Sequence, residues 1–244
     1  MNETKALTPP ALPPQIPTVP TRTPLGADPS ERAPISGLAS VAEALLRQPR
    51  RVMYQLGQPG ASRLSVALIL TASLCSLIYG VVAGTFSGGE QLWAAPVKIA
   101  AGLLLSALIC LPSLYVFTCL GGSQAGLAEV VGWVSGALAL TTLLLIGFAP
   151  VAWVFSQSTE SVAAMGALHL VFGAIAVCFG LRFLSAAYVH RDAKSIGGLA
   201  VWMLIFVLVL LQMTTALRPM VGKAETLLPT EKRFFISHWV QCLK

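Results

Sequence analysis

Charged residues are scarce in this sequence: Asp, Glu, Lys and Arg together make up only 11% of its 244 residues. A soluble domain of ordinary composition carries about 25% of such residues. Hydrophobic residues account for 55% of the chain. This composition excludes an ordinary soluble globular fold and indicates an integral membrane protein. The few basic residues are better explained by membrane topology than by nucleic-acid binding.

The sequence also lacks the short motifs that carry enzymatic chemistry. It has no phosphate-binding glycine loop, no HExxH metal motif and no GxSxG nucleophile motif. Its five cysteines form no CxxC pair, and their odd number argues against a disulfide framework. We therefore expect a protein that is not an enzyme and holds no metal or cofactor.

Five apolar segments dominate the rest of the chain. A membrane-spanning helix needs about 20 consecutive apolar residues, and all five segments reach that length. They are Leu64–Phe86, Leu92–Cys119, Val130–Phe155, Val162–Leu181 and Ile196–Leu217. The predicted fold is an all-α bundle of five transmembrane helices over residues 61–217.

A proline-rich region precedes the bundle. Nine of the sixteen prolines fall between Pro9 and Pro34, and proline removes backbone donors and favours extended chain. We expect residues 1–37 to form a disordered tail or spacer. The stretch Pro17–Arg22 fits the loose PxxP pattern that SH3 domains bind, but proline-rich tails produce such matches by chance.

A basic, amphipathic segment is expected at residues 38–60. Ser40 and Glu43 have the spacing of a capping box, which predicts the start of a short helix that Pro49 ends. Several arginines surround it: Arg47, Arg50, Arg51 and Arg63. They suit either a helix lying on anionic headgroups or plain topology signalling.

The distribution of basic residues predicts the orientation. The same four arginines precede the first span, and Arg191 and Lys194 lie in the link between spans four and five. The positive-inside rule places both segments in the cytoplasm. The N-terminus is then cytoplasmic and the C-terminus lies on the opposite side, in a bacterial inner membrane or a eukaryotic endomembrane.

The tail at residues 218–244 contains a second amphipathic segment. Phe235 and Trp239 are spaced to share one face of a helix that is too short and too charged to span. Such a helix suits the membrane interface, where tryptophan is enriched. A docking site for a partner protein has the same pattern, and the sequence does not separate the two.

Ionisable residues inside the spans are candidate sites because each is costly in hydrocarbon. Lys98 is near the outer end of span two, where it can snorkel. Glu129 begins span three and Arg182 follows the end of span four, at similar depth. We expect these two side chains to form a structural ion pair, since further carboxylates for a proton or ion relay are missing.

His169 is the most distinctive polar residue of the spans. It shares one helical face with small residues, among them Gly173 and Gly180. Small residues allow close helix contact, across which a histidine forms hydrogen bonds. Gln212 of span five is at a compatible depth and is the expected partner. A substrate or proton site at His169 is the alternative interpretation.

The layout resembles the Yip family of Rab-interacting membrane proteins. Those proteins have a polar, proline-containing cytoplasmic N-terminal region and five closely spaced spans, and Tyr79-Gly80 in span one adds to the likeness. The Asp-Leu-Tyr-Gly-Pro stretch of eukaryotic members is absent here. The resemblance covers residues 38–217 and implies a non-enzymatic protein that acts through partners.

Three functions are compared on this basis. The preferred hypothesis is a non-catalytic scaffold or assembly subunit whose partners are the lipid bilayer and other proteins, or a second copy bound through small-residue faces and the C-terminal helix. The second is a small transporter or channel subunit with a polar site near His169. The third, an intramembrane enzyme, has no visible nucleophile, base or metal set.

Overall fold

The computed structural model describes residues 23–89, 91–191 and 196–216, which form helices and connecting loops without a β-strand. The elements in chain order are η1 (Pro29–Arg32), α1 (Leu38–Arg47), α2 (Pro49–Leu56), α3 (Ser62–Thr85), α4 (Gln91–Leu120), α5 (Leu127–Ser158), α6 (Val162–Val189) and α7 (Gly197–Ala216). Phe235 and Trp239, like residues 1–22 with the PxxP stretch, lie outside the described residues.

The prediction of five long apolar helices is confirmed. Helices α3 to α7 are each long and apolar enough to cross a membrane. The predicted end of span four at Leu181 is wrong, because α6 continues to Val189. Arg182 interrupts the apolar run without breaking the helix, and Phe183, Leu184 and Ala187 beyond it are buried.

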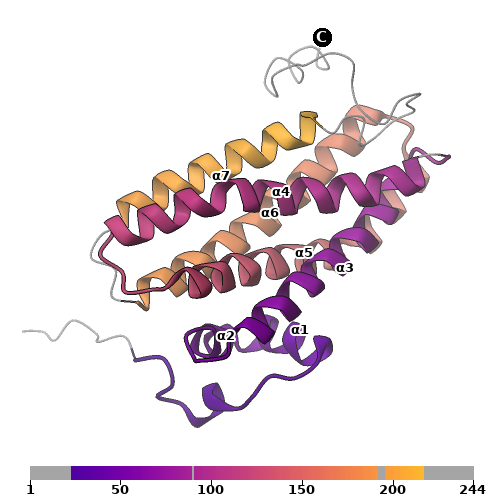
Figure 1. The fold of residues 1–244 in the computed structure, drawn as a ribbon. Helices are drawn as coiled ribbons and strands as arrows, with labels where there is room; N and C mark the ends of the chain where they lie inside the picture. Colours follow the sequence, from indigo (N-terminus) through magenta and orange to yellow (C-terminus); the bar gives the residue numbers. More distant parts are fainter. Residues whose placement is uncertain (1–22, 90, 192–195, 217–244) are drawn as a thin grey trace, which may run out of the picture.

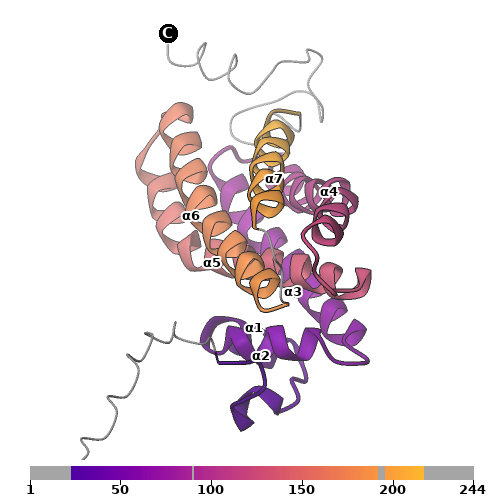
Figure 2. The same ribbon diagram turned by 90° about the vertical axis from the view of Figure 1, so that its left-hand side faces the viewer.

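The long helices are arranged as two pairs joined through α3. Helix α5 packs against α3 and α6, and α4 packs against α3 and α7. Figure 2 shows α5 beside α6 and α4 beside α7, with α3 between the pairs. The Trp202 indole N–H of α7 donates a hydrogen bond of 2.8 Å to the Cys110 carbonyl of α4. This bond anchors α7, which has α4 as its main neighbour.

A small folded unit lies below the long helices in Figure 1. It comprises residues 23–57, with η1, α1 and α2, and is called the N-terminal cap here. Its helices contact α3 and α5. The side chains of Val41, Leu45 and Leu56 are at most 2% exposed within the main apolar core. The cap is therefore packed onto the bundle, at what is called the cap end.

Two predictions about this region are wrong. Residues 23–37 are not a free tail, because Leu25 and Ile35 pack against the apolar core. Helix α1 begins after Gly37, whose φ of 87° favours glycine, and not at a Ser40 capping box. Pro49 separates α1 from α2 and also occupies the first turn of α2, where a missing N–H costs nothing.

Candidate functional site

The cap contains an ion pair whose carboxylate is almost closed to solvent, while the Arg50 side chain is 37% exposed. Glu31 is 6% exposed. It accepts a hydrogen bond of 2.6 Å from Arg50 Nε and one of 2.5 Å from the Gly26 amide. Burial alone raises the pKa of the Glu31 carboxyl, but the hydrogen bonds from Arg50 and Gly26 outweigh it and leave that pKa below its ordinary value. Glu31 thus joins the chain before α1 to the first turn of α2.

Two neighbouring side chains of α2 bind carbonyl groups of the proline-containing segment that precedes α1. Arg50 Nη2 donates to the Thr23 and Pro24 oxygens, at 3.1 and 3.2 Å. Arg51 donates to Ala33 and Pro34, at 2.9 and 3.0 Å. Proline residues have no backbone N–H and cannot build a regular ladder in this segment, so arginine side chains supply donors for its carbonyl groups. These arginines therefore have a structural role that the sequence analysis missed.

A second ion pair lies where the cap meets the bundle. Arg191, just after α6, donates from Nε to Glu129 Oε1 at 2.5 Å and from Nη2 to Oε2 at 2.9 Å. The same Nη2 lies 3.4 Å from the Gly57 carbonyl oxygen. A Cβ at Gly57 would be only 2.7 Å from Nη2. The guanidinium thus joins α5, the end of α6 and the end of α2.

The expected partner of Glu129 is wrong. Arg182, not Arg191, was expected on grounds of depth, but α6 extends well past Arg182 and brings Arg191 level with Glu129. Arg182 lies on an exposed side of α6. The bidentate geometry of the observed pair is the arrangement in which an arginine and a carboxylate interact most strongly.

His169 has a different partner from the one expected. Its Nδ1 lies 2.7 Å from the Tyr79 hydroxyl, which joins α6 to α3. The two rings meet edge to face, with centroids 5.6 Å apart. Gln212 is on α7, which packs against α4, and makes polar interactions of its own. The predicted role of His169 as a hydrogen bond across helices holds, with Tyr79 in place of Gln212.

The other nitrogen of this histidine stands out. His169 Nε2 is buried and has no hydrogen-bond partner. Its partner Tyr79 belongs to a small apolar cluster, and Phe172, about one turn further along α6, stacks on Phe148 at a centroid distance of 4.7 Å. A neutral imidazole satisfied at one nitrogen suits this surrounding better than a charged one. The pair is therefore a structural link with one unused polar atom.

Lys98 is more buried than expected for a snorkelling side chain. It is 4% exposed, in the second turn of α4, and takes part in polar interactions. It is thus not a free cation on the lipid-facing surface.

The small-residue faces are used only in part. Gly180 lies so close to α5 that a Cβ would be 2.7 Å from the Ala137 carbonyl oxygen, and Gly136 lies similarly against Phe183. A Cβ at Gly166 or Gly173 would meet nothing within 4 Å. Helices α5 and α6 thus make their closest contact in the half of the bundle nearer the cap.

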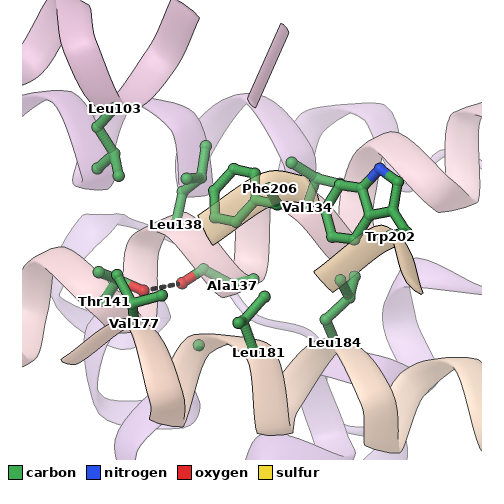
Figure 3. A pocket seen from close by; sticks show the side chains of 11 residues that line it. Leu103, Val134, Ala137, Leu138, Thr141, Val177, Leu181, Leu184, Trp202 and Phe206 are labelled. Atoms are coloured by element: carbon green, nitrogen blue, oxygen red, sulfur yellow. Dashed lines mark hydrogen bonds between the residues drawn. The ribbon is translucent and has the colours of Figure 1, made fainter. Parts of the chain in front are cut away.

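An apolar cavity of about 20 Å³ lies between the two helix pairs. Figure 3 shows Leu103, Trp202 and Phe206 approaching it from one side, and Val177 and Leu181 of α6 from the other. Its polar side chain, Thr141, donates its hydrogen bond to the Ala137 carbonyl. The volume is enough for one water, but the apolar lining lacks the polar partners that would hold it, and the cavity is too small to form an aqueous path.

No group of three metal-binding side chains occurs in the part of the chain that the structure describes. No protein-family model, curated protein or solved structure matches this chain. The Yip resemblance therefore stays a prediction. Three features distinguish the molecule: the N-terminal cap with its Glu31–Arg50 pair, the Glu129–Arg191 pair at the junction of cap and bundle, and the buried Tyr79–His169 link.

Proposed function

We propose that this protein is a non-catalytic, multi-pass membrane scaffold that presents its N-terminal cap to partner proteins. The observation that carries the proposal is the attachment of the cap to the bundle through Arg191, which contacts both Glu129 and Gly57. A spacer needs no such fixed attachment, whereas a surface that must be recognised does, because order present before binding lowers the entropic cost of association.

The cap also carries apolar side chains that the bundle leaves uncovered. On α1, Val41 and Leu45 face the core, while Leu38 and Leu46 are 44% and 54% exposed. Two exposed leucines on a cap that is otherwise rich in arginine suit a protein contact. In the proposed orientation the cap is cytoplasmic, as the positive-inside rule favours, and the C-terminus is on the other side.

The test is quantitative mass spectrometry of proteins that co-purify with the tagged full-length chain from its native membrane. Arg50→Ala removes the partner of the buried Glu31 carboxylate and loosens the cap. Arg47→Ala is the matched control, because its pair with Glu43 is exposed and contributes little. We expect a stoichiometric partner with the wild type and Arg47→Ala, and its depletion with Arg50→Ala. The same proteins with all three chains would contradict the proposal.

A second candidate function rests on one observation. The buried, unpartnered Nε2 of His169 is the kind of polar atom that a transported solute or proton would use. The apolar lining of the cavity between the two helix pairs argues against this function. Uptake into vesicles that contain the purified chain tests this candidate, and abolition of uptake by His169→Gln would favour it over the scaffold.

A further inference from the structure

Arg182 is a cation on the outer surface of a helix that is apolar around it. Its side chain is exposed on α6, and no hydrogen-bond or ion-pair partner for it occurs among the described residues. Its neighbours along that surface, Cys178 and Phe179, are also exposed. An unpaired guanidinium beside hydrocarbon is costly, so an anion from outside the chain is expected there.

The depth of Arg182 follows from the contacts of α6 with α5. Phe183 packs against Gly136, which places Arg182 level with that part of α5. Gly136 is 17 residues from Trp153, or about 25 Å along the helix at its usual rise. Trp153 is 51% exposed near the opposite end, where tryptophan marks the membrane interface.

The hydrocarbon core is about 30 Å thick. Counted from Trp153, Arg182 is therefore within about 5 Å of the boundary on the cap side, which a guanidinium can reach by snorkelling. This depth suits a lipid phosphate better than the carboxylate of a second buried helix. A symmetric contact between two copies through this surface would place two like charges together.

An open surface recess lies between Arg182 and the cap end of α6. Its lining is Ser185, Ala186, Val189 and His190. At 100° per residue, Ser185, Ala186 and Val189 lie within about 60° of Arg182 around the helix axis. The carbonyl groups at the end of a helix repel anions, so Arg182 is the residue that gives this recess an affinity for negative charge.

We propose that Arg182 and this recess bind the headgroup of an anionic phospholipid from the leaflet on the cap side. The guanidinium would hold the phosphate by paired hydrogen bonds, the headgroup would occupy the recess, and an acyl chain would lie along Cys178 and Phe179. The site is independent of the proposed partner contact, since it is on α6 and not on the cap.

Native mass spectrometry of the full-length chain in detergent tests the site, with phosphatidylglycerol and phosphatidylcholine of identical acyl chains as probes. We expect the wild type to prefer phosphatidylglycerol. Arg182→Gln should weaken its binding about fivefold, the factor for one basic residue at an anionic surface. Arg47→Gln is the matched control, because Arg47 lies on the cap and its charge is paired with that of Glu43, and it should bind like the wild type.

Two further measurements keep the result decisive. A photoactivatable phosphatidylglycerol should label peptides that contain residues 178–190 in the wild-type chain. This measurement does not depend on the folding of any variant. Excess inorganic phosphate should not compete, because the acyl chain contributes to binding. Equal binding by Arg182→Gln and the wild type, labelling confined to other helices, or a partner protein cross-linked at Cys178 in native membranes would each overturn the proposal.

Discussion

The two ends of this molecule use different chemistry to hold their helices together. At the cap end, two ion pairs, Glu31–Arg50 and Glu129–Arg191, tie the N-terminal cap to itself and to the bundle. In the opposite half, the link between α3 and α6 is the neutral contact of Tyr79 with His169. Charged pairs need partial solvation or several hydrogen bonds to offset their desolvation, whereas a neutral pair costs much less in hydrocarbon.

This difference is the basis for the proposal that the cap end is the half used for recognition. The cap end holds its charges in fixed positions near the membrane surface, where they also bind backbone carbonyls. The opposite half combines apolar packing with the Tyr79–His169 hydrogen bond. Substitutions in either half test this difference between the two ends.

The largest effect is expected from breaking the pair at the junction. Arg191→Ala should lower the free energy of unfolding by about 3 kcal/mol, because the largely buried Glu129 carboxylate then remains without a counter-charge. Chemical denaturation in detergent measures this change. In a double-mutant cycle, Glu129 should couple to Arg191 and not to Arg182. Coupling to Arg182 instead would show that the pairing is wrong.

Close packing between α5 and α6 should give the next effect. Gly180→Ala places a methyl group against the Ala137 carbonyl oxygen and Thr141, and overpacking of this kind costs about 2 kcal/mol. Gly173→Ala on the same helix has open space and should be neutral or slightly stabilising. Thermal unfolding of both variants in one detergent checks this, and equal losses would contradict the difference between the two halves.

Acidification should release the cap before it affects the bundle. The pKa of Glu31 is below its ordinary value of 4.5 in the folded chain, so its contribution to stability is present above that value. The contribution is lost as the pH falls through the folded pKa. Hydrogen exchange of amides in α1 and α2 should accelerate in this range. The acceleration should disappear in Glu31→Gln and persist in Asp28→Asn, whose carboxyl is exposed; a profile unchanged by Glu31→Gln would refute this role.

The smallest effect is expected at the neutral link. Tyr79→Phe removes one hydrogen bond inside the bundle, and such bonds contribute about 0.6 kcal/mol in membrane proteins. Adding His169→Phe should restore part of the loss, since both polar atoms are then gone. A loss above that of Arg191→Ala would show that the dominant polar interaction is in the half of the bundle away from the cap.

The sequence predicts the five long helices well because hydrophobicity and length determine them locally. It misses the end of α6, because an arginine such as Arg182 marks a change in polarity but leaves the backbone ladder intact. That error alone directs Glu129 to the wrong partner. Only the observed helix length brings Arg191 to the same level.

The cap and the histidine link depend on tertiary contacts. The prolines before α1 indicate extended chain, and nothing in their own pattern shows that Arg50 and Arg51 hold their carbonyls. His169 is recognisable from its small-residue face, but Tyr79 becomes its partner only once α3 and α6 are known to meet there. The sequence feature that could have identified Tyr79 as this partner is its hydroxyl group, at a similar depth in span one.

The central claim is that specificity lies in the N-terminal cap and not in the interior of the bundle. The most direct measurement compares the co-purifying proteins of Arg191→Ala, which removes the polar attachment of the cap to the bundle, with those of His169→Gln, in the same membrane and detergent. We expect loss of a stoichiometric partner with Arg191→Ala and its retention with His169→Gln. Retention with Arg191→Ala and loss with His169→Gln would contradict it.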